Sequence, residues 1–415
     1  MGDLLGREGA VSVGEALRLL FENLTIGDIP ELDVPVTEAF GRVLACEAVS
    51  PEDLPGFSRS TMDGFAVSSA DTFGATETAP AYVSVSGEVP MGRSPELELS
   101  RGQAARISTG GMLPSGADAV VMLEHVQELE GGMIEVQRAV APGENVIMRG
   151  EDLRAGQRVL GRGRLLRPHD VAVLAGSGFS DIRVYRRPSA AIISTGDEVV
   201  PAGRPVEPGQ VRDMNSVTLA GLLSEDGCIP IRRGIVRDEL EELREALEGA
   251  LEASDAVLIS GGSSVGARDL TEKAIAGMGD ILFHSVSMKP GKPLMAGIVK
   301  GKAVYGLPGH PRAVSVCYDV FIRPVMKKLA GMAPDVSDEF RNAVWARLAR
   351  SISSSPGRQE VFSVALVSRD GALWAEPVLG KSGLLNILVK ADGTITVPAE
   401  KPGLGKGETV RVRLL

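Results

Sequence analysis

The chain has 415 residues, 44% of them hydrophobic and 24% charged, and its formal net charge is −10. This length exceeds what one hydrophobic core normally holds, so we expect two to four domains. The acidic balance argues against nucleic acid as the main partner, because phosphate binding needs a basic surface.

Cysteine usage and the hydropathy pattern indicate the compartment. Cys46, Cys228 and Cys317 are isolated, with no CxxC pair, which favours buried thiols in a reducing environment over disulfides or a zinc site. The first residues carry acids rather than the apolar core of a signal peptide, and no apolar run is long enough to span a membrane. We therefore expect a cytoplasmic protein.

The first third of the chain predicts a helix followed by a β-rich segment. Residues 12–24 place apolar side chains at helical spacing after Ser12, which predicts a serine-capped helix. Residues 31–50 mix a strand with a short helix. Residues 51–144 contain short apolar runs with frequent turn signals, typical of a β-rich lobe.

A second short helix is predicted at 167–178, with Pro168 in its first turn and a glycine at its end. We expect this helix to pack on the N-terminal one. Segments 1–50 and 145–187 would then form a single linking domain that the lobe interrupts.

From 188 to 335 the pattern changes to alternating strands and helices. The apolar runs "SAAIIS", "CIPIRRGIV" and "DAVLIS" alternate with helical segments, which predicts a mainly parallel sheet with helices on both faces. Residues 336–415 contain short alternating strands, which predict a small β-barrel or sandwich. The expected fold class is a multidomain α/β plus β protein: a three-layer α/β/α domain, a β-rich lobe, a linking N-terminal domain and a C-terminal small β-barrel.

Three loops are expected beyond the carboxyl ends of strands, where open parallel sheets bind ligands. They are "TGDE" at 195–198, "SGGSSVGARD" at 260–269 and "KPGKP" at 289–293. A Gly/Ser loop offers N–H groups and hydroxyls to phosphate oxygens, and paired lysines can balance an oxyanion. Glu198 and Asp269 supply hard oxygen ligands for Mg²⁺. Each loop alone could be only a turn, but together they favour a phosphorylated ligand.

Seven motifs resemble those of the molybdopterin molybdenumtransferase family, which includes bacterial MoeA and the gephyrin E domain. In chain order they are "STMDGFAV", "RISTGGMLPSGADAVVMLE", "GENVIMRGED", "STGDE", "SGGSSVGARD", "MKPGKP" and "GLPGHP". The resemblance implies cleavage of adenylylated molybdopterin with Mg²⁺, insertion of molybdate and release of AMP. It also implies a homodimer whose active site is shared between subunits.

The resemblance and the three loops together give a set of candidate site residues. The catalytic candidates are Asp63, Thr109, Asp152, Glu198, Asp238, Asp269, Lys289 and Lys292. The substrate-binding candidates are Thr195, Gly196, Asp197, Ser260, Gly261, Gly262, Ser263, Ser264, Pro308, Gly309, His310, Arg358 and Ser382. Glu198 and Asp269 are the candidate metal ligands.

Some of these residues have a purely structural alternative. Asp63 could form an Asx turn before Gly64, and Thr109 could satisfy the backbone before a glycine. Asp238 could be only the N-cap of the helix that follows. These alternatives stay open at the level of sequence.

The chain departs from the family pattern in one motif. The family usually shows G-L-P-G-N-P-V-S, whereas this chain has "GLPGHPRA", with His310, Arg312 and Ala313. Neutral His both donates and accepts only in one tautomer, unlike Asn. Arg312 would either add a cation beside the pocket or start the following helix with its side chain in water. A paralogue that prefers tungstate is therefore an alternative.

Two further functions remain as alternatives. The α/β domain also resembles the fold of molybdopterin adenylyltransferases, and the family's occurrence in gephyrin allows a non-catalytic scaffold. The lobe and the C-terminal β domain favour the transferase, and the full set of acids and lysines argues against a degenerate site. Expected partners are an adenylyltransferase, a molybdoenzyme or its chaperone, with neither nucleic acid nor membrane.

Overall fold

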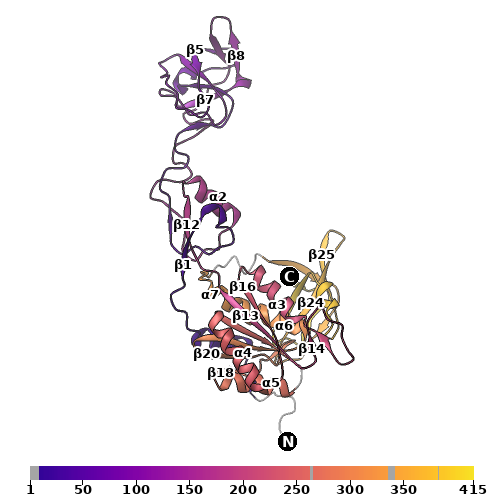
Figure 1. Ribbon diagram of the computed structural model, residues 1–415. Coiled ribbons are helices and arrows are strands. Elements are labelled where there is room, and N and C mark those ends of the chain that lie inside the picture. Colours follow the sequence, from indigo (N-terminus) through magenta and orange to yellow (C-terminus); the bar gives the residue numbers. More distant parts are fainter. Residues whose placement is uncertain (1–8, 262–264, 335–341, 382) are drawn as a thin grey trace. The chain divides into compact units, whose positions relative to one another are not determined.

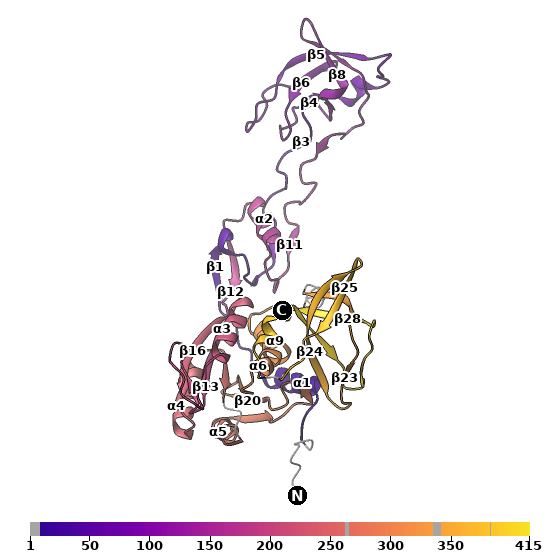
Figure 2. The ribbon, with the colours of Figure 1, turned by 90° about the vertical axis from the view of Figure 1, so that its right-hand side faces the viewer.

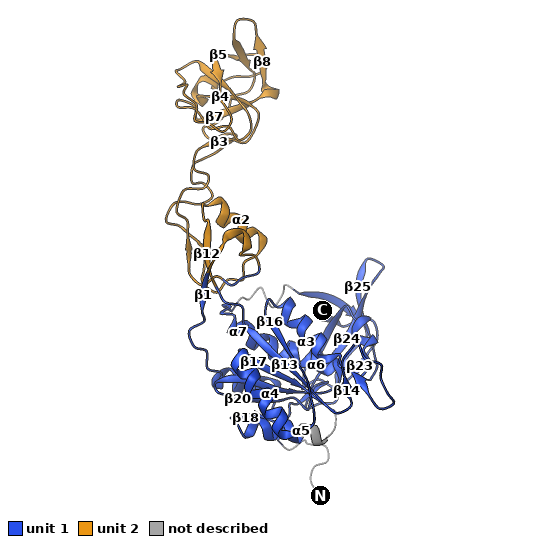
Figure 3. Ribbon diagram, in the orientation of Figure 1, with its two compact units in different colours: residues 1–32, 41–43, 185–415 blue, residues 33–40, 44–184 orange. Residues whose placement is uncertain are grey.

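The computed structural model describes residues 9–261, 265–334, 342–381 and 383–415. The chain divides into two compact units (Figure 3). Each unit has hydrophobic cores of its own. Unit 1 comprises Met1–Leu32, Gly41–Val43 and Tyr185–Leu415, and unit 2 comprises Asp33–Phe40 and Leu44–Val184. None of the helices in the described residues combines the length and the apolar character needed to cross a membrane.

Unit 1 contains a six-stranded sheet in the order β16-β13-β17-β21-β20-β18. The strands, in that order, are Ile229–Val236, Ser189–Thr195, Ala256–Ser260, Lys302–Leu307, Met295–Val299 and Asp280–Phe283. The first four are parallel, and β20 runs antiparallel to both of its neighbours. The mainly parallel sheet predicted from the alternating pattern is therefore confirmed.

Helices cover both faces of this sheet (Figures 1 and 2). They are α1 Val13–Asn23, α3 Asn215–Glu225, α4 Leu240–Ala253, α5 Val265–Ala276, α6 Pro311–Cys317 and α7 Arg323–Leu329. Successive side chains of β13 point to opposite faces. Ala190 and Ile192 lie in the core shared with α1, α3, α6 and α7, and Ala191 and Ile193 lie in the core shared with α4 and α5. The result is the expected three-layer domain.

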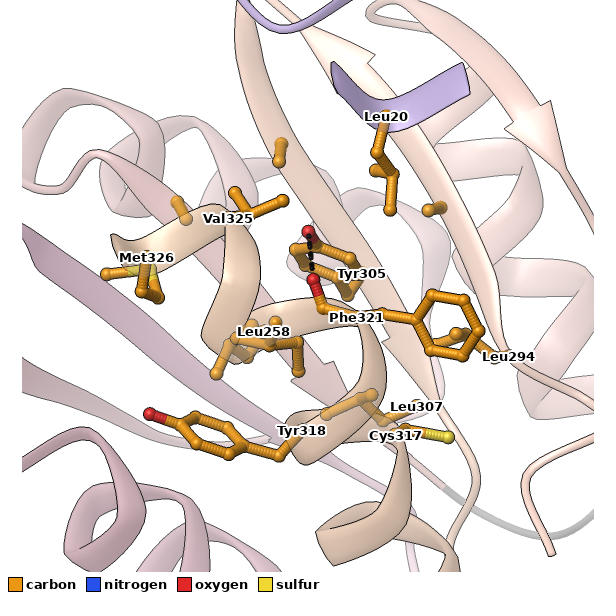
Figure 4. Packing of buried hydrophobic residues seen from close by; sticks show 14 of the residues in the cluster. Leu20, Leu258, Leu294, Tyr305, Leu307, Cys317, Tyr318, Phe321, Val325 and Met326 are labelled. Atoms are coloured by element: carbon orange, nitrogen blue, oxygen red, sulfur yellow. Dashed lines mark hydrogen bonds between the residues drawn. The ribbon is translucent and has the colours of Figure 1, made fainter. Parts of the chain in front are cut away.

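The larger core brings distant segments together (Figure 4). Leu20 of α1 and Tyr305 of β21 are fully buried with residues of the closing helix, and the Tyr305 hydroxyl lies 3.5 Å from the Phe321 carbonyl oxygen. That closing helix is interrupted by a π-helical turn, Tyr318–Ile322, between α6 and α7. Pro324 lacks an N–H to donate to the preceding turn, which accounts for the irregularity.

The C-terminal part of unit 1 is a closed barrel. Its strands are β22 Ala343–Leu348, β24 Gln359–Arg369, β25 Ala372–Pro377, β26 Gly393–Val397 and β28 Thr409–Leu414. The order β24-β25-β22-β28-β26 closes because β26 also pairs with β24. The barrel alternative is therefore the correct one. A short strand, β19 Met288–Lys289, adds in parallel to β24 and joins the barrel to the α/β domain.

The remaining short elements of unit 1 lie in connections. They are β14 Val199–Val200, which pairs with β15 Val211–Arg212, β23 Ile352–Ser353, which pairs with β27 Gly403–Leu404, and the helical turn α9 Asn386–Val389.

Unit 2 contains the predicted β-rich lobe. Its six-stranded sheet has the order β7-β4-β6-β5-β9-β8, with Phe65, Val121 and Ile134 in its core. In that order the strands are Ala119–Met122, Gly64–Val67, Gln103–Ile107, Ala81–Glu88, Met133–Val136 and Val126–Leu129. The 3₁₀ turns η2 Ser69–Thr72 and η3 Leu123–His125 flank them, and β3 Arg59–Ser60 pairs with β10 Val146–Ile147.

A smaller core holds the other segments of unit 2. They are β1 Glu31–Pro35, η1 Val36–Glu38, β2 Ala48–Val49, β11 Arg158–Leu160, α2 Pro168–Gly176 and β12 Asp181–Tyr185. The first two residues of β1 and the last residue of β12 are counted in unit 1. The expected packing of α2 on the N-terminal helix is wrong. Leu174 of α2 lies in a core with Val36 and Ala39, whereas Ala16 and Leu20 of α1 are buried in the core of unit 1, so the apolar face of α1 is already covered.

Candidate active site

The loops predicted to bind a ligand leave the α/β sheet at one edge. Thr195, the last residue of β13, pairs with Val236 at the end of β16. Ser260, the last residue of β17, pairs with Ser194 on one side and with Leu307 on the other. The loops that follow these four parallel strands therefore start side by side.

The "KPGKP" segment reaches the same edge for a different reason. It leads into β20, which runs antiparallel to β21, so Met295 at the start of β20 pairs with Gly306 near the end of β21. Lys289 itself belongs to β19 and pairs with Glu360 of the barrel. Lys292 is half-buried in the turn. This segment thus stands where the α/β domain meets the barrel.

The glycines of this edge allow a close approach of backbone to side chains. A Cβ at Gly261 would lie 1.9 Å from Thr195 Oγ1, and Thr195 is buried. Gly196 has φ +131°, and a Cβ there would lie 2.8 Å from Glu198 Oε2. Both positions therefore exclude larger residues. Gly262, Ser263 and Ser264, which continue the Gly/Ser loop, lie outside the described residues.

Three acids gather beyond β13 and β16. The Asp238 N–H donates to Asp197 Oδ1 at 3.4 Å. Burial raises the pKa of Asp238, and the neighbouring charges of Asp197 and Glu198 raise it further. The cap position of α4 is taken by Glu239, so the alternative that Asp238 is only an N-cap is wrong.

The candidate metal ligands are not brought together by any contact that the structure describes. Asp269 lies exposed on α5, and no hydrogen bond or ion pair among the described residues joins it to Glu198. Among the described residues, no group of three or more His, Cys, Asp or Glu side chains is placed so that it could hold a metal ion. The neighbouring carboxylates of Asp197, Glu198 and Asp238 nevertheless fit Mg²⁺. This ion often takes one or two protein carboxylates and completes its shell with substrate oxygens and water.

A basic group forms where β19 meets the barrel. Lys289 Nζ lies 3.4 Å from Glu360 Oε1, and Arg358 donates to the same oxygen through Nε at 2.8 Å. Glu360 is only 3% exposed. Sequence reasoning found both cations and missed the acid between them, although an acid inside the apolar strand "QEVFSVALV" was a visible signal.

Of the two environments expected for Arg312, the one in water is wrong. Its side chain is buried and donates to the Val361 carbonyl oxygen of β24 at 2.8 Å. Burial lowers the pKa of Arg312, and the charge of Glu360 opposes this shift. Because α6 packs beside the barrel, the residue that follows "GLPGHP" is enclosed there rather than placed in water.

His310 and the turn before it lie at the carboxyl edge of β21. Pro308 is buried, Gly309 is half-buried, and His310 is exposed at the cap position of α6. A Cβ at Gly383 would lie 3.5 Å from the His310 ring. Ser382, beside that glycine, lies outside the described residues.

Asn215 is a further residue that sequence reasoning missed. Its amide donates to Ser260 Oγ and to the Gly309 carbonyl oxygen, both at 2.9 Å. It therefore ties the loop after β17 to the turn after β21. The helix-start pattern "DMNS" was the available signal, because the Asp213 carboxylate accepts the Ser216 N–H at the start of α3.

In unit 2 the structure links two of the three candidates. Thr109 donates to Asp63 Oδ1 through its N–H at 2.7 Å and its hydroxyl at 3.1 Å. The Asp63 carboxylate thus binds a residue from a distant loop rather than its own turn. Asp152 is exposed, and its N–H donates to the Leu54 carbonyl oxygen.

A cavity of about 190 Å³ lies at the opposite, amino edge of the α/β sheet and contains none of the candidates. Its charged side chains include Arg186, which binds Asp255 at 2.8 Å, and Lys302, which donates to the Ser254 carbonyl oxygen at 2.8 Å. This cavity therefore does not compete with the carboxyl edge as the candidate site.

Comparison with known families covers most of the chain. Residues 11–178 match the MoeA N-terminal region (domain I and II), residues 191–328 a probable molybdopterin binding domain, and residues 345–415 the MoeA C-terminal region (domain IV). The chain belongs to the MoeA family. The resemblance inferred from the seven motifs is thereby confirmed.

Relatives in the MoeA family are similar over nearly the whole chain. A molybdopterin molybdenumtransferase 2 of Mycobacterium tuberculosis is 32% identical over 92% of this chain and 94% of its own length. A putative molybdopterin biosynthesis protein of Methanocaldococcus jannaschii is 36% identical, with 92% of each chain covered. The crystal structure of a molybdopterin biosynthesis MoeA protein from Pyrococcus horikoshii matches with a TM-score of 0.84 and 33% identity, covering 98% of this chain and 100% of that one. The chain is therefore an enzyme of molybdenum cofactor biosynthesis.

Proposed function

We propose that this chain inserts molybdate into adenylylated molybdopterin, with Mg²⁺-dependent cleavage of the substrate and release of AMP. The observation that carries the proposal is the distribution of charge along the carboxyl edge. Asp197, Glu198 and Asp238 follow the strands at one flank, and Lys289 leads toward the strand at the other. Ser260 and Gly261, the first residues of the Gly/Ser loop, lie between them at the end of β17. Such an edge suits a ligand that needs a cation at one end and anion-binding groups at the other.

The acidic flank would hold the cation. Glu198 is its proposed ligand there, with Asp197 and Asp238 adding negative charge nearby. The family resemblance adds Asp269, on α5, as the second proposed ligand. When bound, Mg²⁺ would supply Lewis-acid stabilisation of the charge that develops as AMP leaves. The burial of Asp238 beside two other acids supports this assignment, because carboxylates of like charge crowded together favour a bound cation.

The centre and the basic flank would bind the anionic groups. Gly261 lets the backbone lie directly against Thr195 where the Gly/Ser loop begins, and Asn215 holds Ser260 in place by donating to its hydroxyl oxygen. Because that oxygen accepts from Asn215, the Ser260 hydroxyl hydrogen is directed elsewhere and can serve a substrate oxygen. Lys289, Lys292 and Arg358 would balance the charge of molybdate.

The proposal is tested by incubating the purified chain with adenylylated molybdopterin, Mg²⁺ and molybdate. AMP release and reconstitution of a cofactor-free molybdoenzyme are the two readouts, and both should depend on molybdate and Mg²⁺. Formation of adenylylated molybdopterin from molybdopterin and ATP would instead indicate an adenylyltransferase. Binding of the substrate with neither AMP nor cofactor released would indicate a scaffold.

A further inference from the structure

Glu360 is a buried acid on which two outward-reaching cations converge. Its side chain is 3% exposed, whereas the side chains of Lys289 and Arg358 are 57% and 38% exposed. Lys289 Nζ and two nitrogens of Arg358, at 2.8 and 2.7 Å, approach the same oxygen, Oε1. In an ion pair on the surface both partners are exposed to solvent. Here the two cations are exposed to solvent and the Glu360 carboxylate is not.

The position of Glu360 is fixed from three directions. The parallel pairing of β19 with β24 places Lys289 opposite Glu360. Arg358 precedes Glu360 by two residues, in the bend that leads into β24, and its guanidinium contacts the Glu360 carboxylate. Arg312 holds the next residue of β24 by donating to the Val361 carbonyl oxygen. The carboxylate is therefore a rigid anchor, while its two partners have long, flexible side chains.

Glu360 leaves donors of both cations free. A lysine ammonium has three N–H donors and a guanidinium has five, and the contacts to Glu360 use one of Lys289 and two of Arg358. The Ser355 hydroxyl lies within 3.4 Å of Arg358 as well. The remaining donors belong to head groups that are held close together and half-exposed. That arrangement suits a compact tetrahedral oxyanion.

We propose that Glu360 is a positioning residue that joins Lys289 and Arg358 into one oxyanion clamp, and that molybdate is the anion this clamp takes. This inference rests on the proposed function for the identity of the anion. Glu360 does not touch the anion. It acts by holding the two cationic groups in place before the anion arrives, so that less side-chain freedom is lost on binding.

Glu360 also carries a negative charge, which opposes anion binding. That charge is shared among three nearby cations, because Arg312 faces it as well. The orientation of Lys289 and Arg358, in contrast, depends on this one carboxylate. We therefore expect the effect of orientation to outweigh that of the negative charge. Loss of the carboxylate should weaken molybdate binding about tenfold, because both side chains must then be immobilised when the anion binds.

Two variants separate orientation from charge in equilibrium dialysis of the full chain against molybdate, without molybdopterin. Glu360→Gln removes the charge, whereas Glu360→Asp keeps it but shortens the reach toward Lys289 and Arg358. We expect both variants to bind molybdate about tenfold more weakly than the parent. In a chain that already carries Lys289→Met, adding Glu360→Asp should weaken molybdate binding much less than it does in the parent. Tighter binding by Glu360→Gln with unchanged binding by Glu360→Asp would overturn the inference, as would saturable binding unchanged in both.

Asp319→Asn is the matched control for a purely structural effect. Asp319 is likewise a largely enclosed carboxylate, 14% exposed, between a helix and the barrel, paired with Arg323 at 2.8 Å and Arg413 at 3.6 Å. Its substitution should lower the unfolding temperature and leave molybdate binding unchanged. Equal weakening by Asp319→Asn would assign Glu360 to structure. A parent that does not bind molybdate saturably would overturn the clamp, whereas AMP release independently decides the proposed function.

Discussion

Glu198 shows how a single side chain would serve the proposed reaction. It follows the end of β13, and its carboxylate oxygen lies where a Cβ on Gly196 would intrude. Gly196 is thus required for the carboxylate to occupy this position. The neighbouring acids Asp197 and Asp238 add negative charge, which suits a role in holding a cation rather than in binding phosphate directly.

Glu198→Gln and Asp269→Asn should each slow AMP release by about 10²-fold while substrate binding is largely retained. Each amide keeps the shape of the side chain and removes the charge that would hold Mg²⁺. The measurement is single-turnover AMP release across a Mg²⁺ titration. Glu207→Gln, at an exposed position in the loop after β14, is the control and should behave as the parent. Unaltered rate and Mg²⁺ dependence in both variants would contradict the assigned cation site.

Gly261→Ala should destabilise the protein by about 1–3 kcal/mol, because overpacking a filled site forces side chains or backbone to move. The new Cβ would lie 1.9 Å from Thr195 Oγ1, an oxygen that is itself buried. Chemical denaturation measures the loss, which should be smaller when Thr195→Ala is also present. Gly221→Ala on α3, where a Cβ meets open space, should instead stabilise by up to about 1 kcal/mol. Equal effects at both glycines would contradict the steric account.

Among elements, α2 depends on one buried carboxylate. Asp170 in its first turn accepts from Arg164 and Arg167, and its side chain is 6% exposed. It also accepts the Arg167 N–H at the start of the helix. Although burial opposes ionisation, the hydrogen bonds from the two arginines hold the pKa of Asp170 well below its ordinary value. This acid therefore links the strand-rich segment before α2 to the helix itself.

Asp170→Asn should lower the free energy of unfolding by about 3 kcal/mol at neutral pH, because two partly buried cations lose their partner. A depressed pKa contributes stability above the unfolded-state pKa and loses it as the pH falls. The difference between parent and variant should therefore be constant above about pH 5 and shrink as the pH falls through the ordinary Asp value of 3.8. Urea titrations at several pH values measure it. Asp33→Asn, whose pair with Arg183 is exposed, should change stability by less than about 1 kcal/mol. A pH-independent difference would contradict this account.

For the whole molecule, the candidate residues are divided between the two units. Asp63 and Thr109 belong to unit 2, and the carboxyl-edge residues belong to unit 1. The family resemblance leads us to propose a homodimer in which one subunit's lobe completes the other subunit's site. Such a dimer can be tested by mixing two variant chains, whatever the placement of the units within one chain.

Mixing an inactive Asp63→Asn chain with an inactive Asp269→Asn chain should restore part of the AMP release. A mixed dimer would contain one site with both substitutions and one site with neither, so about a quarter of the parental activity is expected from random pairing of equal amounts. Differently tagged chains, purified together, establish that mixed dimers form. The Asp63→Asn chain mixed with itself is the control. Mixed dimers that form and stay inactive would refute the shared site.

The sequence by itself determined most of the local structure and the family. Helix α4 follows from apolar periodicity and strand β17 from a short continuous apolar run, and α1 begins after Ser12 because that side chain accepts the Glu15 N–H. The seven motifs predicted the family that the comparisons then confirmed. These features are readable because burial of one face leaves a regular pattern in consecutive residues.

Only the tertiary structure decided which side chains share a partner. Lys289 and Glu360 are 71 positions apart, and Asn215 and Ser260 are 45 apart, so neither contact leaves a periodic trace in the sequence. Arg312 is buried because β24 lies over α6. The barrel is closed, rather than a sandwich, because β26 pairs with β24 as well as with β28. Each of these outcomes depends on pairing between distant segments, and Glu360 meets Lys289 only after β19 pairs with β24.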